Sequence, residues 1–205
     1  MKNIFTAILA IALLFSNMAT AQKSKKEFYG PNLPWPNEPT SFFGIKLGAP
    51  LADSMSKCVK VGYSRYGTSR CWWQLSAGEN LQAFVIENSP RIGEHWVGNV
   101  FVSVVDNLVE QMSITVSANN SSELATILLD KFGTPHKMET ETKQNRMGAK
   151  FESTKMTWVG VTYKLTYETI DGKIDEGSIH ISSKKFDTAL ENKFKASAAK
   201  GKDAL

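Results

Sequence analysis

The sequence predicts an α+β fold in which one antiparallel sheet of about seven or eight strands has helices packed on one face. Apolar and polar residues alternate over several short segments, a pattern typical of antiparallel strands with one buried side. Asp106-Asn107 and Asp171-Gly172 each separate two such segments and predict hairpin turns. The chain also passes twice through a helical segment followed by strands, which predicts two pseudo-repeats of helix plus strands.

The strand pattern covers much of the chain after residue 70. In chain order, the expected strands span residues 71–75, 81–88, 99–105, 108–116, 136–142, 155–160, 161–170 and 173–183. Tryptophans lie in the strand that opens the first group and in the strand over residues 155–160.

Three segments have the apolar spacing of an amphipathic helix. The first two, residues 51–61 and 122–132, are each followed by a glycine that can end a helix. Asn120 to Glu123 has the form of a capping box for the second helix. The third helix begins at about Phe186. The apolar stripes consist of Leu51, Met55, Cys58 and Val59, of Leu124, Ile127, Leu128 and Phe132, and of Phe186, Ala189, Leu190 and Phe194.

Residues 1–21 have the pattern of a bacterial signal peptide. Lys2 gives a positive start, residues 4–15 form an almost unbroken apolar run, and a small-x-small cleavage motif ends at Ala21. The apolar run is shorter than the roughly 20 residues that span a bilayer. We therefore expect cleavage after Ala21, a periplasmic or secreted chain, and no stable membrane insertion.

A proline-rich arm over residues 22–41 precedes a single domain over 42–195 and a lysine-containing tail over 196–205. The prolines of the arm, which exclude a helix or a central strand, are Pro31, Pro34, Pro36 and Pro39. We expect an extended arm that lies across the domain and inserts Trp35 or Phe28 into it. The alternative is a proline-rich ligand for a partner's aromatic groove.

The two cysteines, Cys58 and Cys71, are the whole cysteine content of the chain. In an oxidising compartment they allow one intramolecular disulfide. A zinc site needs further ligands, and no histidine lies between or close to them. Redox centres use the much tighter C-x-x-C spacing. The spacing and the compartment therefore predict a structural disulfide rather than a metal site or a redox centre.

Charge and motif content narrow the function classes. The net charge of +4 includes Lys2, which leaves with the signal peptide, and residues 184–205 hold six lysines against three acids, which leaves the body of the domain neutral. A neutral body disfavours nucleic-acid binding. The only histidines are His95, His136 and His180, and no known catalytic, phosphate-binding or dinucleotide motif occurs. We expect no enzyme activity, no metal and no cofactor.

The order of elements carries a resemblance. The segment FFGIKLGAPLADSMSKC, which starts at Phe42, is similar to the opening of many exported bacterial proteins in which Leu-Gly leads into a helix. With the twofold succession of helix and strands, residues 42–195 resemble the tandem-repeat fold of the β-lactamase inhibitor proteins and, in each half, the small outer-membrane assembly lipoproteins. The resemblance implies protein binding by the open sheet face and transfers no functional residue.

Strand alternation predicts which residues lie on that open face. If Cys58 points from a helix toward the sheet, Cys71 must point back, and then Trp73 and Leu75 are core residues while Trp72 faces outward. The same alternation places residues 112, 114 and 116, 161, 163, 165 and 167, and 179 and 181 inside, and His180 outside. Trp72 and His180 are therefore candidate partner-binding residues.

The segment 89–98 is a second candidate, because it places Arg91, His95 and Trp96 in a loop between strands, and aromatic residues with arginine are typical of interface hot spots. The competing interpretation is that Trp96 covers the edge of the core and the charges face water. Together the sequence favours an exported, non-catalytic protein-binding module, such as an inhibitor or neutraliser of an enzyme or toxin. The alternatives are an envelope assembly or scaffold factor and an enzyme of unrecognised type.

Overall fold

The computed structural model describes residues 35–59, 69–76, 78, 80–95 and 97–202. The expected signal peptide, most of the proline-rich arm with Phe28, and Trp96 lie outside the described residues.

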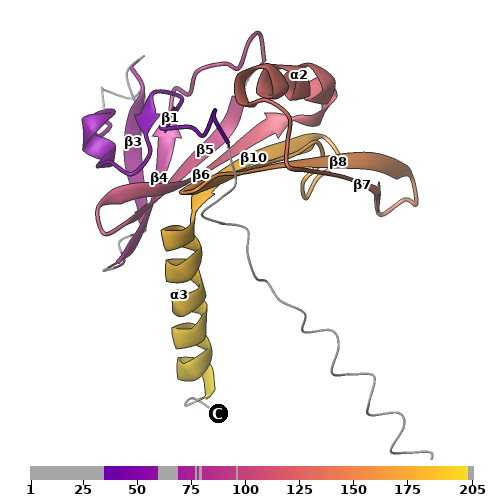
Figure 1. The fold of residues 1–205 in the computed structure, drawn as a ribbon. Helices are drawn as coiled ribbons and strands as arrows, with labels where there is room; N and C mark the ends of the chain where they lie inside the picture. Colours follow the sequence, from indigo (N-terminus) through magenta and orange to yellow (C-terminus); the bar gives the residue numbers. More distant parts are fainter. Residues whose placement is uncertain (1–34, 60–68, 77, 79, 96, 203–205) are drawn as a thin grey trace, which may run out of the picture.

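One antiparallel sheet of eight strands dominates the structure (Figure 1), and the α+β prediction is confirmed at this level. Its strand order is β3-β4-β5-β6-β10-β9-β8-β7, so that two four-stranded meanders meet where β6 pairs with β10. The strands are β3 (Cys71–Ser76), β4 (Leu81–Glu87), β5 (Val97–Val105), β6 (Leu108–Ser117), β7 (Lys137–Gln144), β8 (Lys150–Val159), β9 (Tyr163–Glu168) and β10 (Glu176–Ser183). Two short strands, β1 (Ser41–Phe42) and β2 (Ile45–Lys46), form a separate pair.

Both hairpin predictions are confirmed. Asp106 and Asn107 connect β5 to β6 with φ values of 49° and 67°, the left-handed conformation that a two-residue turn between twisted strands requires. Asp171 and Gly172 lie in the connection from β9 to β10, where the Asp171 N–H donates to the carbonyl of Glu176 at 2.8 Å.

The predicted second helix is confirmed as α2 (Ser121–Phe132), which packs on one face of the sheet. It buries Leu124, Leu128 and Phe132 and ends at Gly133, whose φ is 77°. The capping box is wrong in detail, because the side chain of Asn120 makes no cap hydrogen bond. A 3-10 turn, η2 (Ala118–Asn120), comes first, and the Ser117 hydroxyl caps it.

The predicted first helix is wrong over the part that the structure describes. Residues 51–53 form only a single 3-10 turn, η1 (Leu51–Asp53). Residues 56–58 then run beside β3, where the Cys58 N–H donates to the Trp72 carbonyl at 3.0 Å and the Trp72 N–H to the Ser56 carbonyl at 3.2 Å. An edge strand offers unpaired backbone groups, and pairing with them outweighs the weak helical preference of this segment.

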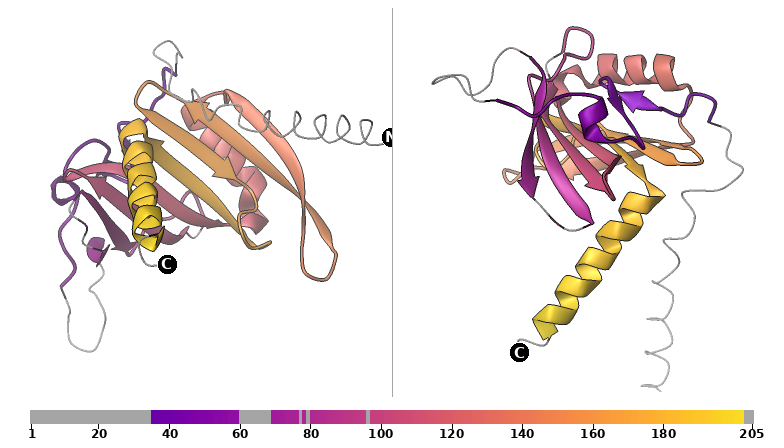
Figure 2. Two further views of the ribbon diagram at one scale, coloured as in Figure 1. Left: turned by 90° about the horizontal axis from the view of Figure 1, so that it is seen from below. Right: turned by 90° about the vertical axis from the view of Figure 1, so that its left-hand side faces the viewer.

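The expectation that all helices share one face is also wrong. α3 (Lys184–Lys202) begins where β10 ends and lies on the side of the sheet opposite α2 (Figures 1 and 2). Residues 35–51 already fill the rest of the α2 side with the buried side chains of Trp35, Phe42, Ile45 and Leu51. These residues pack beside α2 on the same side of the sheet.

The start of the described chain is fixed to the domain by two side chains. Trp35 is buried, as the sequence predicts for the arm, and its indole N–H donates to the Phe132 carbonyl at 2.9 Å. The Glu38 carboxylate accepts from the backbone N–H groups of residues 161, 162 and 163 at 2.9, 2.8 and 2.6 Å.

Tyr163 lies close to this attachment. Burial, with the nearby carboxylates of Glu110 and Glu38, raises the pKa of Tyr163 to about 12. This tyrosine therefore stays neutral.

The side of the sheet that α2 covers contains the core. The alternation predicted for β6, β9 and β10 is confirmed: the buried side chains are Met112, Ile114, Val116, Tyr163, Leu165, Tyr167, Ile179 and Ile181. Val161, which the sequence also places inside, is 62% exposed because it precedes the first residue of β9.

Candidate functional site

The open face of the sheet, the side opposite α2, is the candidate functional surface. Strand register aligns one row of side chains across it. From β3 to β9 this row contains Trp73, Val85, Phe101, Ser113, His180 and Thr166. The row changes from apolar on the first three strands to polar on the others.

Trp73, Val85 and Phe101 form the apolar part of the row, which we call the open-face patch. Phe101 is 37% exposed, and Trp73 and Val85 are half-buried. Each residue comes from a different strand, β3, β4 or β5, and the register places each directly beside the next. A contiguous apolar surface with two aromatic rings is thus held on three paired, rigid strands.

The sequence prediction for β3 is wrong, because Trp72 lies on the core side and Trp73 on the open face. The Trp72 ring packs edge-on against Phe84 with centroids 5.2 Å apart, and its indole N–H donates to the Met55 carbonyl at 3.1 Å. Leu75, predicted as core, is 56% exposed. The Trp72 side chain is therefore part of the fold rather than a free anchor.

The error has a clear origin. Cys58 and Cys71 form the predicted disulfide, with Cα atoms 4.9 Å apart. Cys58, however, lies in the extended segment beside the edge of β3 and not on a helix above the sheet. A disulfide between two neighbouring extended segments does not indicate which face of the strand is covered.

The polar part of the open face is a network of paired charges. His180 is half-exposed, as predicted, and its Nε2 lies 3.5 Å from Asp171 Oδ2. The Ser178 hydroxyl, followed by His180 and Lys143, holds the pKa of Asp171 below its usual value, although partial burial acts in the opposite direction. Glu168 accepts ion pairs from Lys143, at 3.6 Å, and from Lys155.

This network is not arranged for catalysis by a nucleophile. Asp171 lies between Ser178 and His180, whereas activation of a serine requires the histidine to lie between the hydroxyl and the carboxylate. Among the described residues, no group of three or more His, Cys, Asp and Glu side chains is placed to hold a metal ion.

The structure does not bring the second candidate segment to the open face. Arg91 and His95 lie in the β4–β5 connection, where His95 Nε2 is 2.7 Å from the Glu123 carboxylate of α2. Arg91 lies 3.9 Å from Glu94 on the same loop. His95 therefore attaches this loop to α2, on the other side of the sheet from His180. Trp96 lies outside the described residues.

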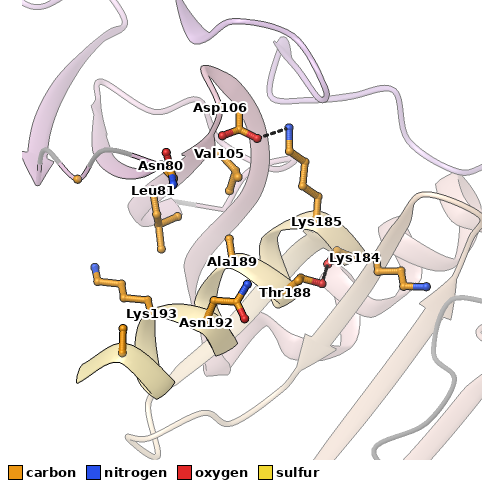
Figure 3. Close-up of a pocket in the computed structure, with 12 residues that line it drawn as sticks. Asn80, Leu81, Val105, Asp106, Lys184, Lys185, Thr188, Ala189, Asn192 and Lys193 are labelled. Carbon is orange, nitrogen blue, oxygen red and sulfur yellow. Dashed lines mark hydrogen bonds and ion pairs between the residues drawn. The ribbon is translucent and has the colours of Figure 1, made fainter. Parts of the chain in front are cut away.

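A groove on the open face was not predicted from the sequence. It lies between α3 and the ends of β4 and β5, has a volume of about 910 Å³, and is shown in Figure 3. Its sheet side includes Leu81 and Val105. Leu81 lies four residues before Val85 on β4, and Val105 lies four residues after Phe101 on β5, so both lie on the same face as the open-face patch.

Phe101 could have been identified from the sequence, because it is a large apolar residue at an outward position of a strand.

Comparison with known proteins gives no relative: no family model, no curated protein and no solved structure matches this chain. Within the described residues, the helices are too short or too polar to cross a membrane.

Proposed function

We propose that this chain is an exported, non-catalytic protein-binding module that inhibits or neutralises another protein, such as an enzyme or a toxin. It binds this partner with the open-face patch. The observation that carries the proposal is that the exposed Phe101 and the half-buried Trp73 and Val85 lie side by side on the open face, outside the buried core cluster.

The patch has the composition of an interface centre. Tryptophan and other aromatic residues are enriched at interface hot spots, and exposed apolar groups rimmed by polar ones mark interaction surfaces. Ser113 and His180 continue the same row and supply such a polar rim. Phe101, the most exposed member, provides the anchor, while Trp73 and Val85 support it.

Two further features support export. The disulfide between Cys58 and Cys71 is a bond that persists in oxidising compartments and is rare in the cytosol. The pattern of residues 1–21 is that of a signal peptide with cleavage after Ala21. We infer a periplasmic or secreted protein.

The strand order supports the tandem-repeat interpretation. Each half contributes a four-stranded meander, and the last strands of the two meanders, β6 and β10, pair in the middle of the sheet. The proposed repeat concerns the strands, because among the described residues an α-helix, α2, precedes the second meander and only the 3-10 turn η1 precedes the first. This organisation favours the resemblance to the β-lactamase inhibitor proteins, and with it protein binding by the open sheet face.

Site-specific photo-crosslinking tests the proposal. A photoreactive phenylalanine analogue is placed at Phe101 and, as the matched control, at Met147, which is 90% exposed in the β7–β8 connection. In cells of the native host we expect position 101 to capture one soluble protein in stoichiometric amount, and position 147 not to capture it. Equal capture at both positions, or none at position 101, would contradict the proposal. Capture of outer-membrane assembly components at position 101 would favour the envelope assembly role instead.

A further inference from the structure

The groove between α3 and the sheet has an apolar floor. Leu81 and Val105 contribute from neighbouring strands, where they are directly paired, and Ala189 faces them from α3. Figure 3 shows Ala189 below Val105 with open space beside Leu81. The volume of about 910 Å³ is in the range of small-molecule sites. The alanine leaves space between the helix and the strands that a larger side chain would fill.

The two ends of this floor differ in charge. At one end Lys185 points toward Asp106, with Nζ 3.1 Å from the carboxylate and 3.9 Å from that of Glu110, so this end has one more carboxylate than ammonium groups (Figure 3). At the other end Lys193 lies beside Leu81, with the amide group of Asn192 on the same helix, whereas Asn80 lies at the Asp106 end, where its carbonyl accepts from the Asp106 N–H at 3.4 Å. Within the described part of the chain, Lys193 forms no ion pair with a carboxylate.

We propose that this groove binds a medium-chain carboxylate, with its carboxylate on Lys193 and its acyl chain along Leu81, Val105 and Ala189. The Lys193 ammonium, with the amide donor of Asn192 next to it in the chain, suits a head group of one negative charge. Lys185 with the two carboxylates of Asp106 and Glu110 closes the far end of the apolar floor, limits the length of the chain and disfavours a second negative charge there. The site is independent of the open-face patch and of the function proposed for it.

A peptide strand fits this groove less well. Extended peptides bind by adding to a free strand edge. Both strands that form the floor are already paired on both sides, β4 with β3 and β5, and β5 with β4 and β6. The groove therefore offers apolar contact and charge rather than main-chain hydrogen bonds.

Calorimetric titration of the mature protein with hexanoate, octanoate, decanoate and dodecanoate, each below its micelle concentration, tests the proposal. We expect binding at one site, with affinity rising about threefold for each added methylene. Lys193→Gln should lower the affinity for dodecanoate about tenfold. Ala189→Phe, which fills the groove, should abolish binding. Lys195→Gln is the matched control, because Lys195 pairs with Glu191 and does not line the groove, and it should leave the affinity unchanged.

Three results would overturn the proposal. The first is an affinity that does not change with chain length, and the second is equal loss in Lys193→Gln and Lys195→Gln. The third is equal binding of dodecyltrimethylammonium, which carries the opposite charge. Methyl NMR locates the ligand independently of the variants: the signals of Leu81 and Val105 should shift with dodecanoate and those of Val85 should not. Shifts at Val85 alone would place the ligand on the open-face patch and contradict the assignment.

Discussion

The two faces of the sheet are built from alternate residues of the same strands, yet they differ in composition and in what covers them. On the α2 side, β6 and β10 contribute Met112, Ile114, Ile179 and Ile181, all fully buried. On the open face the same two strands contribute Gln111, Ser113 and His180. The α2 side thus supplies most of the apolar burial that stabilises the fold, while the open face adds little beyond Val105 under α3.

This difference makes the open-face patch informative. A solvent-facing side of an antiparallel sheet is normally polar, as β6, β9 and β10 are here. Trp73, Val85 and Phe101 depart from that pattern on three neighbouring strands without being required by the core. Apolar residues that folding does not require are candidate binding residues.

Replacing a large aromatic residue on each face should give the largest difference in the free energy of unfolding. Trp158 is fully buried on the α2 side, and its indole N–H donates to the Gly133 carbonyl at 2.8 Å. Trp158→Ala should lower the free energy of unfolding by about 3 to 5 kcal/mol, because it opens a cavity. Phe101→Ala should lower it by about 1 kcal/mol or less. Urea unfolding measures both, and similar losses for the two variants would contradict the distinction between the faces.

Removing the disulfide should have the next largest effect. It closes a loop between residues 13 positions apart and holds the 56–58 segment against the edge of β3. The double substitution Cys58→Ser and Cys71→Ser should lower the free energy of unfolding by about 3 kcal/mol. Thiol titration of the denatured, unreduced wild-type protein should detect no free cysteine. Two free thiols would show that the bond is absent.

The adjacent tryptophans of β3 test the assignment of its faces. Trp72→Ala removes the packing against Phe84 and the hydrogen bond to Met55, and should cost about 2 to 3 kcal/mol of stability. Trp73→Ala should cost about 1 kcal/mol, because Trp73 lies on the open face. Urea unfolding of the two single variants measures both losses of stability and shows which tryptophan faces the core. The opposite order of losses would place Trp73 in the core and remove it from the patch.

The sequence was sufficient wherever a strand alternates cleanly. β6 carries apolar residues at every second position over 112–116, and β10 over 179–181, so the inner and outer sides of these parts could be assigned correctly. β3 contains Cys71, Trp72 and Trp73 in succession, which gives no alternation, and its assignment depended on a helix at Cys58 that does not form. Apolar spacing over residues 51–59 resembles that of a helix, but pairing with an edge strand is a tertiary event that local spacing does not report.

The candidate site was only partly predictable for the same reason. His180 was placed on the open face correctly, because it lies between the buried Ile179 and Ile181. The groove was not foreseen, because Ala189 and Lys193 meet Leu81 only through the direction in which α3 leaves β10. That direction is a tertiary feature, and no local sequence pattern encodes it.

The smallest expected effect is a shift in the pKa of Asp171, which belongs to the paired charges on the polar part of the open face. The pKa of Asp171 is expected below the ordinary 3.8, chiefly because of the Ser178 hydroxyl and then His180. A depressed pKa means that the ionised carboxylate contributes stability above pH 3.8, and that this contribution is lost as the pH falls through the lower folded-state pKa. Carboxyl NMR titration should show a lower midpoint than in the unfolded chain. Ser178→Ala should move it back toward 3.8, and an unchanged midpoint would exclude this contact as the cause.

We propose that the open-face patch binds a partner without being needed for folding. Its most direct test measures one substitution twice, once for the affinity toward the protein captured at position 101 and once for the free energy of unfolding. Phe101→Ser should weaken binding by about 2 kcal/mol, roughly 30-fold, while it changes the free energy of unfolding by about 1 kcal/mol or less. Full affinity in a folded Phe101→Ser variant would contradict the claim.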